Sequence, residues 1–212
     1  MKKQYNIEEK KRIENELRDE GYKHICGVDE VGRGPLAGPV VCAAVILPAD
    51  CAIEGIDDSK KLSEKRREEI SEQIINEAIS YSIQFIFEEE IDKLNILNAT
   101  KKGMVKAVNS LSVMPDIVLI DGNQKIDIET PQKTVIHGDS LVYSIGAASI
   151  IAKVARDRFM KEQDAIYPQF AFKENKGYGT KAHMDALRQF GPCKIHRKTF
   201  LKFLGDRNEQ LG

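Results

Sequence analysis

The sequence is poor in cysteine, in net charge and in long apolar segments, and each shortage excludes a class of protein. Only four cysteines occur among 212 residues, and they form neither a CxxC pair nor a zinc-finger pattern with histidine. No apolar run reaches the length of a membrane span, and the charged residues 1–12 lack the apolar centre of a signal peptide. We therefore expect a reduced, cytoplasmic protein with no membrane association.

The near absence of net charge directs attention to local patches. With 32 basic and 33 acidic residues the net charge is -1, which gives no overall attraction to nucleic acid. Residues 172–202 nevertheless hold eight basic residues against two acidic ones. We interpret this stretch as a candidate nucleic-acid footprint. Its basic residues are Lys173, Lys176, Lys181, Arg188, Lys194, Arg197, Lys198 and Lys202.

Apolar periodicity predicts an α/β chain. Strands are expected at residues 25–31, 40–47, 81–87, 117–120 and 134–137, and helices at residues 5–20, 64–80, 90–111 and 144–160. Ser63 is a candidate N-cap, and the helix at 5–20 should be peripheral. The order predicts a mixed sheet with helices packed on it, in which ligands gather beyond the carboxyl ends of strands.

The most informative segment lies where the first strand ends. Asp29 and Glu30 follow buried apolar residues, and Gly32, Arg33 and Gly34 come directly after them. Neighbouring strand residues point to opposite faces, so both acids reach one site only where the strand ends and turns. Glycine permits such a turn and the close approach of a ligand, and arginine offers a fork for phosphate. The segment predicts a metal site facing a phosphate backbone.

Two further acids follow strands in the same way. Asp121 ends its strand before a glycine, and Asp139 comes after the next strand on a predicted loop. Four clustered carboxylates would raise one another's pKa unless a cation compensated them, and oxygen ligands suit Mg²⁺ or Mn²⁺. Asp157 competes with Asp139 for the fourth place, but its position between Arg156 and Arg158 on a helix favours a structural ion pair.

These residues carry a resemblance to a known family. The segment GVDEVGRGPLAGPV at residues 27–40 resembles the opening signature of bacterial ribonuclease HII, the type 2 ribonuclease H. Later blocks resemble that family's motifs in the same order, from about residue 21 to residue 204. They are DSKKL at 58–62, DGN at 121–123, GDS at 138–140, AASIIAKVARD at 147–157, KGYGT at 176–180 and HRKTF at 196–200.

The resemblance implies a fold and an activity. The fold would be ribonuclease H-like, with a central mixed five-stranded sheet flanked by helices. Residues 1–20 would form an N-terminal helical extension, 21–165 the catalytic domain, and 166–212 a small C-terminal helical extension that binds substrate. The protein would be an endoribonuclease that hydrolyses the RNA strand of RNA/DNA hybrids and cuts 5' of ribonucleotides embedded in duplex DNA. It would act in ribonucleotide removal and RNA primer processing.

The resemblance also implies roles for single residues. Asp29, Glu30, Asp121 and Asp139 would hold two divalent ions, Mn²⁺ or Mg²⁺, and the products would carry 5'-phosphate and 3'-hydroxyl ends.

Substrate recognition falls to other residues. The backbone of Gly32, Arg33 and Gly34 would recognise the 2'-hydroxyl that distinguishes ribose from deoxyribose. Tyr178 would pack on the neighbouring sugar and sense a deoxyribose there, while Lys60 and Lys61 would contact phosphates. His196 is open between a packed structural histidine and a phosphate contact.

Two other function classes fit parts of the sequence. A non-catalytic module that binds hybrids would keep the fold and the basic stretch, but clustered acids near phosphate would not help it. A small-nucleotide binder would use the glycine turn as a phosphate loop, yet no Gly-Lys-Ser/Thr follows. The resemblance implies a monomer, and a sliding-clamp or other replication partner is not readable from the sequence.

Overall fold

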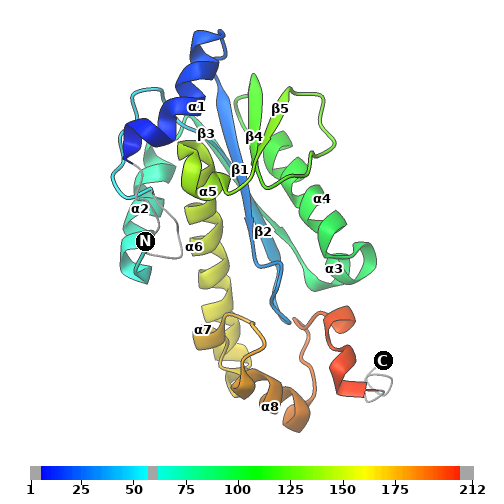
Figure 1. The fold of residues 1–212 in the computed structure, drawn as a ribbon. Coiled ribbons are helices and arrows are strands. Elements are labelled where there is room, and N and C mark those ends of the chain that lie inside the picture. Colours follow the sequence, from blue (N-terminus) through cyan, green and yellow to red (C-terminus); the bar gives the residue numbers. More distant parts are fainter. Residues whose placement is uncertain (1–5, 57–61, 206–212) are drawn as a thin grey trace.

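The computed structural model of the chain describes residues 6–56 and 62–205, and a five-stranded sheet lies at the centre of these residues (Figure 1). The strand order is β3-β2-β1-β4-β5. β1 runs antiparallel to β2 and parallel to β4, so the sheet is mixed, which confirms the predicted α/β architecture. The strands are β1 (Ile25–Val31), β2 (Val40–Ile46), β3 (Ser80–Ile86), β4 (Ile117–Asp121) and β5 (Gln132–Val135).

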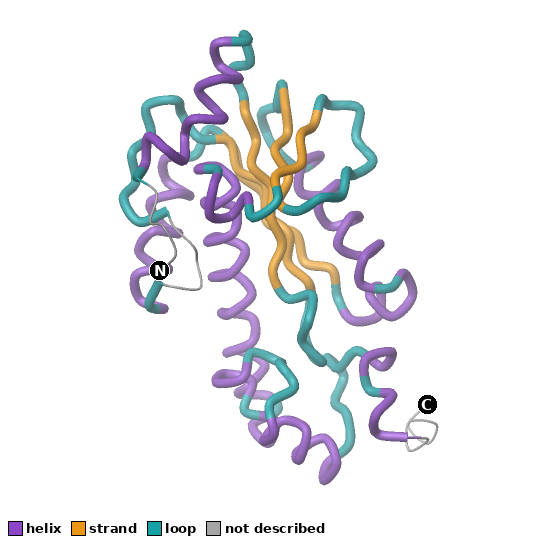
Figure 2. Tube along the Cα trace, in the orientation of Figure 1, coloured by secondary structure: helices purple, strands orange, loops and turns teal. Residues whose placement is uncertain are grey.

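Helices cover both faces of this sheet, with α2 and α6 on one side and α3 and α4 on the other (Figures 1 and 2). Within the described residues none is long and apolar enough to cross a membrane. The helices are α1 (Ile7–Asp19), α2 (Glu64–Glu77), α3 (Glu88–Leu94), α4 (Ile96–Asn109), α5 (Gly138–Leu141), α6 (Tyr143–Ile166), α7 (Phe172–Asn175) and α8 (Lys181–Phe190), with 3-10 turns η1 (Pro168–Phe170) and η2 (Lys198–Phe200).

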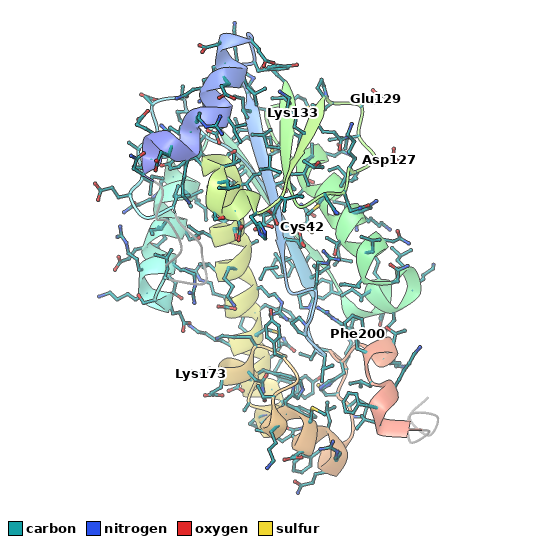
Figure 3. All side chains as sticks on the ribbon, in the orientation of Figure 1. Cys42, Asp127, Glu129, Lys133, Lys173 and Phe200 are labelled. Carbon is teal, nitrogen blue, oxygen red and sulfur yellow. The ribbon has the colours of Figure 1, made fainter. Side chains whose placement is uncertain are left out.

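The alternation of strand side chains explains why β2 is apolar throughout. Val41 and Val45 pack in one cluster with apolar residues of α6, whereas Cys42 and Ile46 pack in a second cluster with residues of α4. Every residue of β2 is buried because both faces of a central strand are covered. Cys42 accordingly lies at the centre of the molecule in Figure 3, as a free thiol.

Helix α6 lies directly against β1, and this close approach fixes the sheet relative to the site. A Cβ on Gly27 would come within 2.2 Å of the backbone of Ser144, so only glycine permits the contact. The buried carboxylate of Glu14 in α1 accepts a hydrogen bond of 2.7 Å from the backbone N–H of Ser144 and caps the start of α6. The helix predicted to be peripheral is therefore docked, and its Leu17 is buried.

Several element boundaries differ from those that the sequence predicts. The single helix expected at residues 90–111 is two helices, because Asn95 adopts φ 66° and its side chain accepts from the backbone N–H of Asn98 to cap α4. β5 begins earlier than predicted, and Asp139 lies in the first turn of the short helix α5 rather than on a loop. The cap at Ser63 is confirmed, since its hydroxyl accepts from the N–H of Arg66.

The chain beyond α6 forms a small helical extension at the far end of that helix (Figure 2). Figure 3 places Lys173 and Phe200 in this part of the molecule. Its core combines apolar residues with two buried histidines, His183 and His196. Their rings lie against Phe170, at centroid distances of 6.0 and 4.8 Å. Burial, together with His183, lowers the pKa of His196 to about 4, and burial lowers the pKa of His183 as well.

Acidification should remove stability through this histidine pair. Between the ordinary pKa of 6.5 and the folded value near 4, the unfolded chain binds a proton at His196 that the folded chain does not. The free energy of unfolding should therefore fall as pH falls through that window, by about 2 to 3 kcal/mol. In His196→Gln this loss is absent. Urea denaturation gives the free energy of unfolding of both proteins at pH 7 and at pH 4.5. Between these pH values the wild type should lose that amount more than His196→Gln does.

His24→Gln is the matched control for this measurement, since His24 lies outside the cluster. Its difference from wild type should change less between pH 7 and 4.5 than that of His196→Gln, because His24 takes no part in the buried ring cluster. A constant difference for His196→Gln would contradict the assignment of a buried neutral imidazole.

Candidate active site

Parallel pairing of β1 and β4 brings the first two candidate acids to the same edge of the sheet. The ladder pairs Val28 with Ile120, so the next residues along, Asp29 and Asp121, end neighbouring strands. Asp29 is buried and Asp121 is half-buried. The structure thus brings together two acids separated by more than ninety residues, at the carboxyl ends where α/β sheets bind ligands.

Asp139 lies beside Asp121, in the short helix α5 that follows β5. Its backbone N–H donates to Asp121 Oδ1 at 3.3 Å, and its negative charge raises the pKa of Asp121, after the larger effect of burial. Gly138 makes the approach possible, because a Cβ there would lie 3.3 Å from Asp121 Oδ1 and 2.6 Å from Ile145. Asp139 is therefore in contact with Asp121.

The charges of the four acids act on one another. Burial raises the pKa of Asp29 well above its ordinary value, and the charges of Glu30 and Asp121 raise it further. Burial likewise raises the pKa of Glu30, Arg33 opposes that rise, and Asp121 adds to it. Mutual repulsion of buried carboxylates of this kind is relieved by a cation among them.

The donor set fits a hard divalent cation, although the side chains would have to rotate to share one. All four donors are carboxylates, the ligands that Mg²⁺ and Mn²⁺ prefer. Asp29 accepts hydrogen bonds from the N–H of Glu30, at 2.7 Å, and from Ser149, while Glu30 lies 3.3 Å from the Arg33 guanidinium. Within residues 6–56 and 62–205 no three such side chains converge on one point. A metal ion bound by Glu30 would compete with Arg33 for this carboxylate.

Asp157, the alternative fourth acid, is occupied elsewhere. Its carboxylate lies 2.7 Å from Lys153 Nζ, one turn earlier on α6, and 3.9 Å from a guanidinium nitrogen of Arg67 on α2. The interpretation as a structural ion pair is confirmed, but the partners are not the flanking arginines. Arg156 instead donates to backbone carbonyls of the loop that follows β1.

Two buried arginines hold the loop that follows β1. The guanidinium of Arg197 donates to the carbonyls of Gly32, at 2.6 Å, of Arg33, at 2.9 Å, and of Gly38. Arg156 donates to the carbonyls of Pro39, at 3.0 Å, Ala37 and Lys176. Both guanidiniums are fully buried. The loop therefore has a fixed shape before any ligand binds.

We call Arg156 and Arg197 with the carbonyls they hold the clamp. The clamp also orients the N–H groups of the loop. In a trans peptide the C=O and the following N–H point in opposite directions, and the described chain has no cis peptide bond. With the carbonyls of Gly32 and Arg33 turned inward to Arg197, the N–H groups of Arg33 and Gly34 point away from the buried guanidinium. Nothing in the sequence pattern predicts this role for Arg156 and Arg197. Their only signal was membership of the later motif blocks, and Arg197 was counted in the basic footprint.

Tyr178 lies beside the same loop. A Cβ built on Gly34 would be 3.7 Å from Cε1 of its ring, and the backbone N–H of Leu36 donates to the carbonyl of Gly177 at 2.8 Å. Tyr178 is 45% exposed, so a ligand can reach its side chain. Lys60 and Lys61, predicted to contact phosphates, lie outside the described residues.

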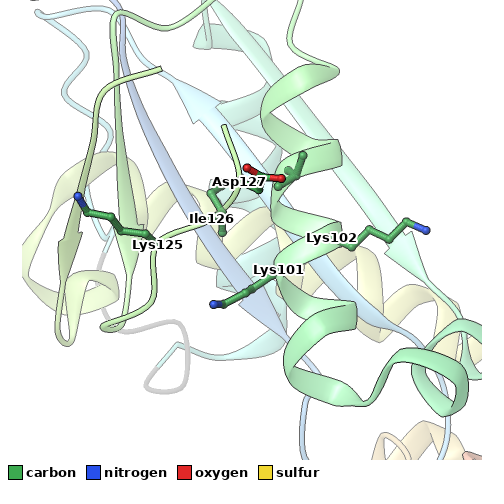
Figure 4. A pocket seen from close by; sticks show the side chains of 6 residues that line it. Lys101, Lys102, Lys125, Ile126 and Asp127 are labelled. Atoms are coloured by element: carbon green, nitrogen blue, oxygen red, sulfur yellow. The ribbon is translucent and has the colours of Figure 1, made fainter. Parts of the chain in front are cut away.

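A separate hollow is lined by none of these acids. A cavity of about 520 Å³ opens between α4 and the loop after β4, as Figure 4 shows. Lys101, Lys102 and Lys125 line it with Val105, Ile126 and Asp127. It holds one carboxylate, whereas the strand ends bring several together. We therefore place the chemistry at the carboxylates of the strand ends rather than in this hollow.

Comparison with known proteins agrees with this geometry. A family model described as Ribonuclease HII matches residues 26–203. The chain belongs to the ribonuclease HII family. It is 52% identical over 190 residues to Ribonuclease HII of Caldicellulosiruptor saccharolyticus, covering 90% of this chain and 93% of that protein. It is 51% identical to Ribonuclease HII of Clostridioides difficile, covering 90% and 74%. The protein is thus a ribonuclease H enzyme.

Solved structures confirm the ribonuclease H-like fold of this ribonuclease HII. The ribonuclease H2 of Pyrococcus horikoshii OT3 aligns with a TM-score of 0.71 and 27% identity, covering 82% of this chain and 92% of that one. The RNase HII of Archaeoglobus fulgidus, solved in complex with PCNA, aligns with a TM-score of 0.67 at 23% identity, covering 86% and 97%. Bst-RNase HIII, solved in complex with Mn²⁺, gives 0.61 at 22%, covering 80% and 63%. The last two show the fold alone.

Gly32→Ala should disrupt the clamp. Gly32 has φ +91°, and a Cβ there would lie 2.2 Å from Nε of Arg156. Strain at the backbone and displacement of a buried guanidinium should lower the free energy of unfolding by about 2 to 4 kcal/mol, measured by urea denaturation.

Gly34→Ala is the matched control, since its Cβ would make an ordinary 3.7 Å contact. It should leave stability within about 0.5 kcal/mol of wild type. Equal losses in the two variants would contradict the clamp.

Proposed function

We propose that the protein hydrolyses the RNA strand of RNA/DNA hybrids and cuts 5' of ribonucleotides embedded in duplex DNA. The products would carry 5'-phosphate and 3'-hydroxyl ends, as needed for ribonucleotide removal and RNA primer processing. The observation that carries this proposal is the placement of Asp29, Glu30, Asp121 and Asp139 beside a rigid loop with outward N–H donors. Carboxylates alone would repel a phosphate. Carboxylates that hold a divalent metal ion would attract it and support hydrolysis of the phosphodiester bond.

Asp29, Glu30, Asp121 and Asp139 would hold the divalent ions, two of Mg²⁺ or Mn²⁺. When bound, such ions supply charge neutralisation at the scissile phosphate and an activated water. The protein's part is to aim the carboxylates with hydrogen bonds. Ser149 and the N–H of Glu30 hold Asp29, and the N–H of Asp139 holds Asp121. The Mn²⁺ complex of Bst-RNase HIII, a protein of the same fold, supports this choice of ion.

The neighbouring groups supply the selection for ribose. The N–H groups of Arg33 and Gly34 point outward from the clamped loop, where they can donate to a 2'-hydroxyl that deoxyribose lacks. Tyr178, whose ring lies against Gly34, would pack on the next sugar. A sugar with a 2'-hydroxyl at that second place would be crowded by the ring. This arrangement favours cutting at a junction between RNA and DNA.

Protein partners enter only as a proposal of the same kind. The Archaeoglobus fulgidus relative was solved bound to PCNA, and a sliding clamp is therefore a candidate partner of this chain. We propose that the enzyme acts as a monomer, as the resemblance to the family implies.

Asp121→Asn should abolish metal-dependent cleavage while leaving hybrid binding largely intact. Loss of one charge-stabilising group typically costs about 100- to 1,000-fold in rate. The assay uses a labelled duplex with a single ribonucleotide, incubated with Mg²⁺, Mn²⁺ or a chelator, and the cut is mapped on a gel.

Asp127→Asn, an exposed acid on the loop after the same strand, is the control and should cleave like wild type. Full activity of Asp121→Asn would sink the assignment. Binding of hybrids without cleavage by the wild type, under any metal condition, would favour a binding module instead.

Tyr178→Ala should weaken the preference for a junction. The ratio of kcat/KM for a single embedded ribonucleotide to that for a continuous RNA strand should fall about tenfold, the cost of one aromatic packing contact. Tyr81→Ala, which removes an exposed tyrosine on β3, should leave the ratio unchanged. An unaltered ratio in Tyr178→Ala would mean that the ring does not contact the sugar.

A further inference from the structure

The buried histidines of the C-terminal extension lie in a hydrogen-bond chain whose direction can be derived. Nε2 of His183 and Nε2 of His196 are 3.0 Å apart. Two ring nitrogens at that distance share one proton, so one ring donates and the other accepts. The contacts at the opposite nitrogens decide which ring does which.

The backbone settles both tautomers. The N–H of Cys193 donates to Nδ1 of His196 at 3.0 Å, so this nitrogen carries no proton. A neutral His196 then carries its proton on Nε2 and donates to His183. Nδ1 of His183 lies 2.9 Å from the carbonyl oxygen of Tyr178, which can only accept, so this nitrogen carries the proton of His183. With both rings neutral this assignment satisfies the contacts to the Cys193 N–H, between the two rings and to the Tyr178 carbonyl, and it leaves the 3.3 Å approach of His196 Nδ1 to the Cys193 carbonyl oxygen without a hydrogen bond.

The chain therefore runs in one direction, from Cys193 through His196 and His183 to Tyr178. The Cys193 thiol can add a second donor to Nδ1 of His196, at 3.1 Å. Both imidazoles are shielded from water by Phe170 and Phe172. A hydrogen bond in such an apolar setting is expensive to leave unmade, which makes the chain rigid.

Each end of the chain lies at a part of the proposed site. At one end the Tyr178 carbonyl also accepts from the N–H of Thr180, at 2.8 Å, within the turn that presents the ring beside Gly34. Towards the other end, His196 immediately precedes Arg197, which holds the loop at residues 32–38. One segment thus positions both the loop and the aromatic ring.

We propose that His183 and His196 are positioning residues, whose directed hydrogen-bond chain sets the place of Tyr178 relative to the Gly32–Gly34 loop and thereby the junction preference. The inference rests on the proposed function, because it assigns a means to a specificity proposed above. It requires no contact between either histidine and substrate.

Two substitutions at one position separate this role from simple packing. In His183→Asn the side-chain amide can place a donor where Nδ1 stands and keep the bond to Tyr178. In His183→Gln the amide reaches the place of Nε2, keeps a contact with His196, and loses the bond to Tyr178. His183→Gln should lower the junction-to-continuous ratio of kcat/KM about fivefold, the effect of one hydrogen bond, mainly through kcat. His183→Asn keeps that bond and loses the one to His196, so its ratio should lie between those of His183→Gln and the wild type.

A second test combines His183→Gln with Tyr178→Ala in one variant. If the chain acts through the ring, His183→Gln should change the ratio no further once the ring is absent. An equal fall in that background, or equal ratios in the Asn and Gln variants, would overturn the proposal. If instead the wild type cuts neither substrate with metal, the proposed function fails; a wild-type preference that Tyr178→Ala removes and His183→Gln keeps refutes the chain alone.

The tautomers give a test that does not depend on the variants folding. Long-range ¹H–¹⁵N correlation spectra of the ¹⁵N-histidine-labelled protein at pH 7 should show His183 protonated on Nδ1 and His196 protonated on Nε2. The reverse tautomer at either residue, or a charged ring, would overturn the directed chain.

Discussion

The site depends on one constraint, the inward orientation of the loop carbonyls after β1. Arg197 and Arg156 reach this loop from 165 and 117 residues away and donate to its carbonyls. Because a peptide plane fixes its N–H opposite its C=O, holding the carbonyls also aims the donors. Arginine suits this task better than lysine, since its planar fork bonds several carbonyls at once. Gly32 leaves the space that the guanidinium of Arg156 fills.

The same buried arginines keep their charge although they are out of contact with water. Among the described residues neither guanidinium forms an ion pair with a carboxylate, and burial lowers the pKa of Arg197 to about 9 and of Arg156 to about 10. Both groups remain charged near neutral pH. The cation that acts on the site acids is Arg33, which opposes the rise in the pKa of Glu30. The buried arginines thus serve the site through the shape of the loop.

The sequence predicted what is local or follows from strand polarity. Alternation and apolar runs located all five strands to within a few residues, and parallel strand ends brought Asp29 and Asp121 together. It failed where a single backbone angle decides, since nothing in the periodicity of residues 90–111 shows that Asn95 turns to φ 66°. It also missed the roles of Arg156 and Arg197. A basic residue on a helix or in a basic stretch is usually solvated, and contacts spanning more than a hundred residues leave no periodic trace.

Arg197 follows His196 directly in the chain. One segment therefore contacts both the loop after β1 and, through His183, the turn that carries Tyr178. The segment around them is anchored to the loop by its backbone as well, since the N–H of Gly38 donates to the carbonyl of Ile195 and the N–H of Arg197 to that of Leu36. A shift of this segment would therefore move the outward N–H donors and, through His183, the Tyr178 carbonyl together. The proposed recognition of a ribose and of the deoxyribose beside it would need a fixed spacing between the two contacts. A common support for both is how a small helical extension can impose that spacing on a site built at the end of a sheet.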